Sequence, residues 1–407
     1  MLMGTAQQVL LFVGMLLAAI VIEPVAKVLR LPFGAALVVV GFVGSNALVA
    51  YGVDTGLRWN TFEPLIASVF IPVLVFEAAL KMEPGRLWRD LVPILVLAMP
   101  VMLIAVAIIA VFIYLAVGHP TGFPWIAAWL TGALVASTDP GAAVAMLRQH
   151  GCFQRVALLL DGESLFNDAL AIVLFATLLP LALMPSMAGL SWFEVIVDTA
   201  VAFFGGIAVG VVVGLLASLV LGVFRHPVHQ GLITVVSAYG SFVVTDSLLS
   251  WSGVMAVLAC GLIEGQFHRR RSSTPHRFVE ELWDFIAYVA GSILFLLAGV
   301  TITTLMFRDQ WLAMLIGIGG VTLSRAISVG AGLSLLRMIP AVPPVPAREQ
   351  VLVAWGGVRG TVTLALALSL PLELDYWFTV QSIAYGVVLF TLFVQTPAFG
   401  VLLRRLA

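Results

Sequence analysis

Charged residues are scarce in this chain, and their scarcity excludes most soluble folds. Only 10% of its 407 residues are Asp, Glu, Lys or Arg, while 61% are hydrophobic. Soluble domains carry about 25% charged residues. The formal net charge is −1, and no basic surface for a nucleic acid is evident. The composition therefore predicts an all-α polytopic membrane protein whose surroundings are a lipid bilayer.

Cysteine is nearly absent, which excludes several kinds of site. The two cysteines, Cys152 and Cys260, form no metal or redox motif, and we expect no disulfide between them. The sequence shows no Cys/His set of the kind that binds zinc or copper. We expect no cofactor.

A charged segment before the first hydrophobic run is also missing. The start, MLMGTAQQ, lacks the basic region of a cleaved signal, so the first run is expected to be a retained helix. We expect one transmembrane domain over residues 1–407 and no soluble C-terminal domain.

Long hydrophobic runs make up the rest of the chain, and about thirteen of them are long enough to cross a bilayer. They lie near residues 7–26, 33–52, 62–80, 91–117, 123–147, 158–184, 193–223, 229–249, 251–266, 283–306, 310–336, 348–370 and 376–403. Asp246 and Glu264 fall near the ends of runs, and we expect both at the membrane interface.

Lys and Arg are sorted between alternate loops. One set of loops holds sixteen of the twenty, and the other set holds only Arg58 and Arg308. Basic residues favour the cytoplasmic side of a membrane. The sorting predicts an outside N-terminus and a cytoplasmic C-terminus, and the compact chain suggests a location in a bacterial inner membrane.

Two of the runs are interrupted. Pro140 and Gly141 follow Asp139 in the fifth run, and a proline disfavours helical dihedrals in the residue before it. In the twelfth run, glycines surround an intramembrane arginine, Arg359, which would compensate the carbonyls at a helix end.

The positions of these interruptions suggest an inverted repeat. The fifth and twelfth runs are seven apart, and an odd offset gives them opposite orientations. We expect repeats over about 1–184 and 229–407, joined by a helix over about 193–223. Helices interrupted in corresponding places of two inverted halves mark the binding sites of transporters.

The sixth run supplies the main carboxylates. Carboxylates at membrane depth are costly and persist mainly where function needs them. Ser164 and Asp168 are four residues apart and share a helix face, while Glu163 and Asn167 form a neighbouring face. With Asp139 and Thr138, Asp168 and Ser164 would make an all-oxygen pocket that suits a hard monovalent cation.

The motifs in these runs resemble those of the monovalent cation:proton antiporters, in the NhaP-type branch that includes the animal sodium/proton exchangers. The resemblance covers essentially the whole chain. It rests on DGESLFND, STDP, LVFEAAL, WGGVRG and SRA, at residues 161–168, 137–140, 74–80, 355–360 and 324–326. It implies the Na⁺/H⁺ antiporter fold, with two crossing broken helices.

The resemblance also implies roles for single residues. Asp168 would carry a proton and a cation in turn, and Asn167 would stabilise the crossing helices. The Asn–Asp pair is associated with electroneutral exchange of one cation for one proton. Glu163 and Arg325 would form a structural ion pair. Family members usually work as homodimers.

Ser164, Asp139, Thr138 and Glu77 would complete the cation site, although three of them have simpler explanations. Asp139 could instead cap a broken helix, and Thr138 could be a packing hydroxyl. Glu77 could be a structural hydrogen-bond partner.

Exchange of Na⁺ or Li⁺ for H⁺ is the function that the sequence favours. A K⁺/H⁺ antiporter would use the same scaffold and stays open as an alternative. An intramembrane hydrolase is a remote alternative, because no intramembrane His or Lys stands ready to activate Ser164. We therefore expect a transporter and not an enzyme.

Overall fold

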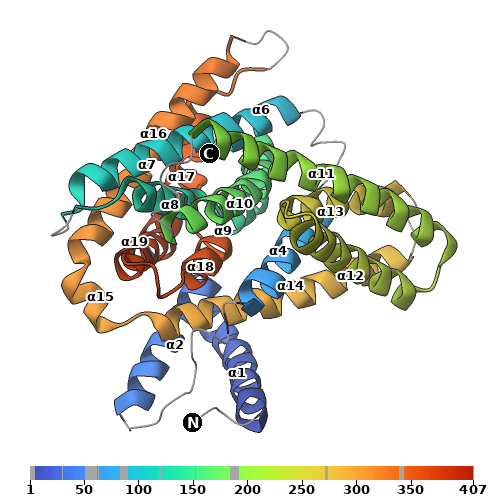
Figure 1. The fold of residues 1–407 in the computed structure, drawn as a ribbon, viewed down its shortest axis with the longest axis horizontal. Helices are drawn as coiled ribbons and strands as arrows, with labels where there is room; N and C mark the ends of the chain where they lie inside the picture. The colour runs from blue at the N-terminus through green and yellow to red at the C-terminus, as the bar shows by residue number, and fades with distance from the viewer. Residues whose placement is uncertain are drawn as a thin grey trace.

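The structure is a computed structural model, and every regular element in the part of the chain that it describes is a helix (Figure 1). The described residues are 5–29, 31–50, 62, 64–82, 90–118, 122–151, 153–183, 192–270, 274–338 and 343–406. Cys152 lies outside them.

Each of the thirteen predicted runs contains helical segments, and several helices extend past the predicted ends of their runs. The first seven runs contain α1 (Thr5–Leu29), α2 (Phe33–Ala50), η1 (Ile66–Phe70) with α4 (Ile71–Lys81), α6 (Leu91–Val96) with η2 (Leu97–Val101) and α7 (Met102–Ala116), α8 (Trp125–Ala136) with α9 (Gly141–His150), α10 (Gln154–Leu183) and α11 (Trp192–Val223). The last six contain α12 (Pro227–Val243) with η4 (Val244–Leu248), α13 (Gly253–Arg270), α14 (Thr274–Thr301), α16 (Trp311–Leu336), α17 (Ala347–Gly356) with α18 (Thr361–Leu368), and α19 (Trp377–Phe390) with η5 (Thr391–Gln395) and α20 (Thr396–Leu406). A short helix, α15 (Thr304–Asp309), precedes α16.

Within the described residues, eleven of these helical stretches are long and apolar enough to cross a membrane. The other two predicted runs hold η1 with α4, and α13, which pack against each other. Polytopic helical architecture is thereby confirmed.

Both predicted helix interruptions are present. The fifth run forms α8 and α9, which residues 137–140 separate, and the twelfth run forms α17 and α18, which residues 357–360 separate. Pro140 and the glycines of the twelfth run cause the breaks, because proline lacks an amide hydrogen and glycine pays more entropy in a helix.

Prolines also accompany three of the π-helical turns. Pro100 lies within η2, Pro72 follows η1, and Pro397 follows η5. A proline cannot donate the helical hydrogen bond, and a locally widened turn relieves the clash of its ring. In η5 the wide turn brings Thr391 and Gln395 beside the second helix break.

The helices divide into two packing groups. The first, here called the core group, comprises α6–α10 and α16–α20, and the second, the outer group, comprises α1, α2, α4 and α11–α14. In Figure 1, α11, α12 and α13 form one side of the molecule, and α1 and α2 extend from its lower edge. Helix α10 joins the groups, since it contacts α4, α11 and α13 as well as its own group.

The long helix α11 packs closely on α13 through a glycine stripe. A Cβ on Gly210 would lie 2.1 Å from the carbonyl oxygen of Ala256, so the two backbones meet without side chains between them. Small residues allow this approach between helices in lipid. The glycines of α11 therefore serve helix contact.

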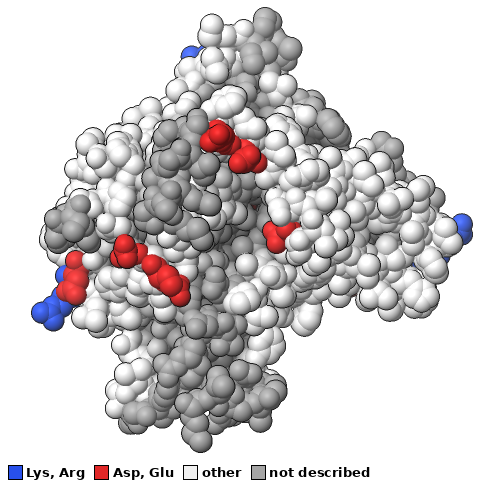
Figure 2. Space-filling model, viewed as in Figure 1, with Lys and Arg blue, Asp and Glu red and all other residues white. Residues whose placement is uncertain are grey.

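On one face of the molecule the visible charged side chains are mostly acidic. In the view of Figure 2, Asp and Glu lie across the face, over the start of α11 and elsewhere, and Lys and Arg appear only at its margins. The same face is hollowed near its centre. This distribution agrees with loops that are sorted by charge.

Candidate functional site

The two helix breaks meet in the middle of the core group. The amide of Asp139 donates a hydrogen bond to the carbonyl of Val358 over 2.7 Å, so the two irregular segments pair through their backbones. The Asp139 carboxylate accepts from the amides of Gly141, at 3.3 Å, and Thr361, at 3.4 Å. These amides begin α9 and α18, so one carboxylate caps both second half-helices.

Gly360 is the residue that permits this approach. A Cβ at this position would lie 2.0 Å from Asp139 Oδ2, which is closer than any nonbonded atoms can come. The position therefore requires glycine for space.

Helix α10 runs beside the crossing and presents polar groups to it. The Ser137 hydroxyl donates to Asp168 Oδ1 over 2.5 Å, and the Ser164 hydroxyl donates to the backbone carbonyl of Thr138 over 2.5 Å. Asp168 and Ser164 are partly exposed, whereas Ser137 and Thr138 are buried. The structure thus brings Asp168, Ser164 and Thr138 together at the break.

Asn167 links the break to the neighbouring face of α10. Its side-chain amide donates to Thr138 Oγ1 over 3.3 Å and to Glu163 Oε1 over 3.1 Å, and it is 1% exposed. Its own carbonyl oxygen is buried without a hydrogen-bond partner. Asn167 therefore holds the first break against α10 through the Thr138 hydroxyl.

Glu163 forms a two-pronged ion pair with Arg325 of α16. One guanidinium nitrogen contacts Glu163 Oε1, and the other donates to Oε2 over 2.9 Å and to the carbonyl of Val353 over 3.1 Å. The two side chains are 1% and 9% exposed. The pair therefore ties α10, α16 and α17 together in the core.

Arg359 lies at the second break, where no carboxylate of the described residues is in hydrogen-bond contact with it. It is 1% exposed and donates to the carbonyl of Gly357 over 3.1 Å, and its Nε has no partner in the part of the chain that the structure describes. Gly357 ends α17, so the guanidinium neutralises the partial negative charge of a helix C-terminus. Arg359 also interacts electrostatically with Arg325, Glu163 and Asp168.

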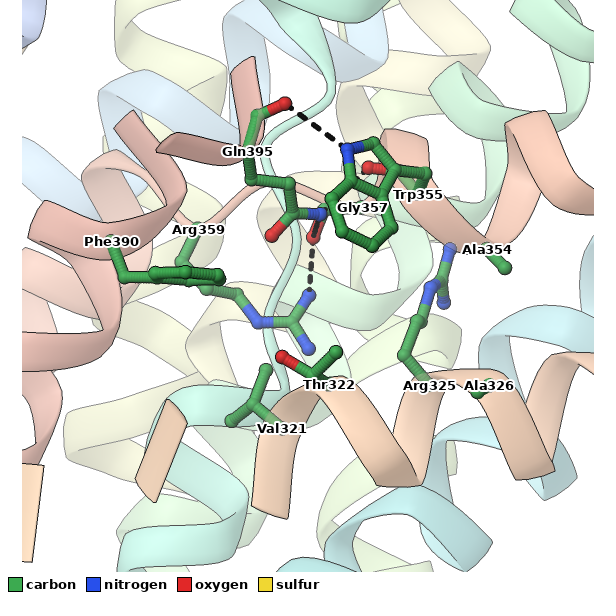
Figure 3. Close-up of a pocket in the computed structure, with 10 residues that line it drawn as sticks. All are labelled: Val321, Thr322, Arg325, Ala326, Ala354, Trp355, Gly357, Arg359, Phe390 and Gln395. Atoms are coloured by element: carbon green, nitrogen blue, oxygen red, sulfur yellow. Dashed lines mark hydrogen bonds between the residues drawn. The ribbon is translucent and has the colours of Figure 1, made fainter. Parts of the chain in front are cut away.

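A cavity of about 70 Å³ opens beside the two arginines (Figure 3). The indole of Trp355 lies between them in this view, and Gln395 faces the same space. The Gln395 amide donates to the carbonyl of Trp355 over 2.6 Å, and Trp355 Nε1 donates back to the carbonyl of Gln395 over 3.2 Å. Thr391 accepts from the amide of Arg359 over 3.2 Å.

Glu77 lies on α4 of the outer group, near enough to Asp139 for the two charges to interact. It forms an ion pair with Lys81, and Lys81 also contacts Asp284 of α14. Glu77 is therefore engaged by an ammonium group in this structure.

The oxygen atoms around the crossing suit a hard monovalent cation. The Asp168 carboxylate, the Ser164 hydroxyl and the Thr138 carbonyl lie together at the first break, and the Asp139 carboxylate lies at the same break on the first amides of α9 and α18. Among the residues that the structure describes, no group of three or more His, Cys, Asp or Glu side chains could hold a metal ion. Oxygen ligands with little net charge favour Na⁺ or Li⁺ over a transition metal.

Three residues, Ser137, Thr391 and Gln395, make contacts at the helix breaks that the sequence did not predict. Ser137 was part of a motif, but nothing in the sequence indicated that its hydroxyl would reach Asp168 from the other side of the break. Gln395 and Thr391 satisfy backbone groups of the second break. Their polarity within an apolar run, just before Pro397, was the available signal.

The interfacial position expected for Glu264 is wrong. Its side chain is 0% exposed, and Cys260 donates to its Oε1 over 3.2 Å. Helix α13 continues to Arg270, beyond the predicted end at 266, so Glu264 lies inside the helix packing and not at a rim. Asp246, by contrast, is exposed.

Comparisons with known proteins agree with this architecture. Residues 12–405 match the family model described as "Sodium/hydrogen exchanger, transmembrane". The chain is 36% identical over 353 residues to the Na⁺/H⁺ antiporter ApNhaP of Aphanothece halophytica, covering 85% of this chain and 66% of that protein. It is 33% identical to the low-affinity Na⁺/H⁺ antiporter NhaS1 of Synechocystis, covering 96% and 72% of the two chains.

A solved structure shares the fold. The sodium proton antiporter MjNhaP1 from Methanocaldococcus jannaschii at pH 8 superposes with a TM-score of 0.83 at 20% identity, covering 98% of this chain and 99% of that one. The chain thus spans nearly the whole of MjNhaP1 but only about two thirds of ApNhaP.

Proposed function

The chain belongs to the sodium/hydrogen exchanger family, and from this we propose that it exchanges Na⁺ or Li⁺ for H⁺ across a cell membrane. Relatives named as Na⁺/H⁺ antiporters support this substrate pair. The observation that carries the proposal is the Asp168 carboxylate beside the crossing of two broken helices, where carbonyl and hydroxyl oxygens converge.

Competition at Asp168 couples the two ions. Burial favours the neutral, protonated carboxyl, whereas a bound cation favours the carboxylate. A proton and a cation therefore exclude each other, and one of them leaves when the other arrives. The Ser137 hydroxyl, which donates to Asp168, supports the charged form until the cation is in place.

Ser164, Thr138 and Asp139 complete the cation site. The Ser164 hydroxyl donates to the Thr138 carbonyl, and both oxygens have lone pairs that a cation could use. Asp139 also caps α9 and α18, so its carboxylate serves the backbone as well as the ion. Glu77 joins the ligands when Lys81 releases it.

Exchange of one cation for one proton is electroneutral because one carboxylate serves both. Asn167, the residue before Asp168, cannot take up a second proton, and it fixes the break through Thr138. Glu163 is held by Arg325 and contributes to structure only.

Alternating access arises from movement of the core group against the outer group. The polar crossing lies wholly in the core group, whereas Glu77 belongs to the outer group. We place the N-terminus outside and the C-terminus in the cytoplasm, since sixteen of the twenty Lys and Arg residues lie in one set of loops. We further propose a homodimer and two inverted repeats, over about 1–184 and 229–407.

Ion-driven proton movement in everted vesicles tests the function. A pH-sensitive dye reports the proton movement when Na⁺, Li⁺ or K⁺ is added. Wild type, Asp168→Asn and the control Asp246→Asn are compared with one another. Asp246 is an exposed aspartate away from the crossing. We expect Na⁺ and Li⁺ responses in wild type and in the control, and none in Asp168→Asn at equal abundance in the membrane.

Two results would contradict the proposal. Exchange retained by Asp168→Asn would remove that residue as the carrier. A wild-type response to K⁺ alone would replace Na⁺/H⁺ exchange with K⁺/H⁺ exchange.

A further inference from the structure

Lys81 bridges two carboxylates from two helices of the outer group. It lies four residues after Glu77, on the same face of α4, and forms an ion pair with Glu77 Oε1. The same ammonium contacts Asp284 Oδ1 on α14. The side chains of Glu77, Lys81 and Asp284 are 19%, 43% and 50% exposed, so Glu77 is the innermost of the three.

The bridge lies at the edge of the proposed transport site. Helix α4 packs against α10, the helix that carries Asp168. Glu77 and Asp139 are near enough for their charges to interact. The carboxylate that Lys81 engages is therefore the one that the outer group offers to a cation in the crossing.

Lys81 and Na⁺ need the same oxygen atoms. An ammonium group is a compact monovalent cation with three hydrogen-bond donors, and it carries the same charge as Na⁺. When Lys81 occupies Glu77, a cation that binds Glu77 must displace it. Asp284 gives the displaced ammonium a second carboxylate that is more exposed to water.

We propose that Lys81 is a tethered cation that holds Glu77 while the transport site is empty and moves to Asp284 alone when Na⁺ binds, so that it sets the apparent affinity for Na⁺. This inference rests on the proposed Na⁺/H⁺ exchange. Lys81 is a positioning residue: it acts through Glu77 and does not touch the transported ion.

Apparent KM for Na⁺ is the first measurement. We expect Lys81→Gln to lower KM about two- to fivefold, the range that partly exposed ion pairs support, while kcat stays within the error of wild type. Asp284→Asn removes the alternative partner, so KM should rise by a similar factor. Lys81→Arg keeps the charge and should restore a KM near the wild-type value.

Lys27→Gln is the matched control. Lys27 also forms an ion pair with a glutamate four residues away, Glu23, at 2.7 Å, but on α1, outside the proposed site. A general effect of removing a positive charge would appear in this variant too, whereas the proposal expects an unchanged KM.

The decisive comparison is made in a Glu77→Gln background. If Lys81 acts through Glu77, Lys81→Gln has no further effect there. The Na⁺-induced rise in melting temperature of the purified protein gives the same comparison without needing transport, in case Glu77→Gln stops exchange. An unchanged KM in Lys81→Gln, or an equal change with and without Glu77, would overturn the inference.

Failure of the proposed function gives a different result. In that case wild type itself shows no Na⁺-driven proton movement, and no variant is needed to see it. If wild type exchanges Na⁺ for H⁺, Asp168→Asn does not, and Lys81→Gln has the wild-type KM for Na⁺, then the proposed function is supported and only the role of Lys81 is refuted.

Discussion

The ion pair between Glu163 and Arg325 places the full charges of two residues in a part of the protein that almost no water reaches. Each charge has lost its hydration and is stabilised by the other, with additional hydrogen bonds from Asn167 and to Val353. Removal of one partner leaves an uncompensated buried charge, which costs about 3–5 kcal/mol. Removal of both charges avoids most of that cost.

Arg325→Gln should therefore destabilise the protein by about 3–5 kcal/mol, and Glu163→Gln with Arg325→Gln should be milder. Melting temperatures of the purified proteins in detergent provide the measurement, and the single Glu163→Gln variant completes the cycle. If wild type and all three variants melt together, the pair has no structural role.

Gly360→Ala should disrupt the site through space alone. The added Cβ would lie 2.0 Å from Asp139 Oδ2, so the two breaks must separate and the bond from Asp139 to Val358 must weaken. We expect at least a tenfold loss of exchange, because misplacement of binding groups by about 1 Å can cost roughly 100-fold in rate.

Gly240→Ala is the control for this substitution. Nothing lies within 4 Å of a Cβ at Gly240, which is within α12, so alanine should be tolerated or mildly stabilising. Wild-type exchange by Gly360→Ala would show that the crossing does not need this close approach.

Residue-scale prediction from sequence succeeded where a side chain breaks a rule of its surroundings. An aspartate before a proline and an arginine among glycines stand out in apolar runs, and Asp139 and Arg359 do lie at the two helix breaks. The bond from Ser137 to Asp168 could not, because serines are common in membrane helices and the contact crosses from one run to another. The interfacial position predicted for Glu264 was wrong because the hydrophobic run ends near residue 266, whereas helix α13 continues to Arg270.

At the scale of elements, the two interrupted helices depend on groups outside themselves. A helix end leaves carbonyls without partners, and these are costly in an apolar environment. At the end of α17 the carbonyl of Trp355 accepts from Gln395, and the carbonyl of Gly357 accepts from Arg359. The π-turn η5 is therefore part of the second break.

Gln395→Leu should destabilise this break. The substitution leaves the Trp355 carbonyl without its donor, which costs about 1–3 kcal/mol for a buried group. The melting temperature should fall, and exchange should fall with it. Gln350→Leu is the control, since Gln350 bonds only to Val345 at the start of α17 and is partly buried. Equal melting temperatures for both variants would argue against the role of Gln395.

The existence of the elements was largely predictable, and their assembly was not. Length and hydropathy predicted the runs, and Pro140 and the glycines around Arg359 predicted the breaks. Pairing of the breaks through Asp139 and Val358 uses backbone groups, which carry no sequence signal. The ends of α13 and α10 also moved by several residues, since helices continue past the apolar stretch that defines a run.

At the scale of the whole molecule, charge sorting sets the orientation in the membrane. The charged residues across the face in Figure 2 are Asp and Glu, and Lys and Arg lie at its margins. Basic loops stay on the cytoplasmic side during insertion. We expect a green fluorescent protein fused after Leu406 to be fluorescent, and alkaline phosphatase fused there to be inactive. The opposite pair of results would reverse the proposed topology.

The ion pair of Glu163 and Arg325 has a consequence for biosynthesis. Its partners are 162 residues apart in the chain. At roughly 5–20 residues per second, the ribosome needs about ten to thirty seconds to reach the arginine after it has made the glutamate. During that interval Glu163 enters the translocation machinery without its counterion, so it must take up a proton, stay near water or be shielded by an insertion factor. The first half of the chain must therefore keep this carboxyl neutral, hydrated or shielded until the second half has been made.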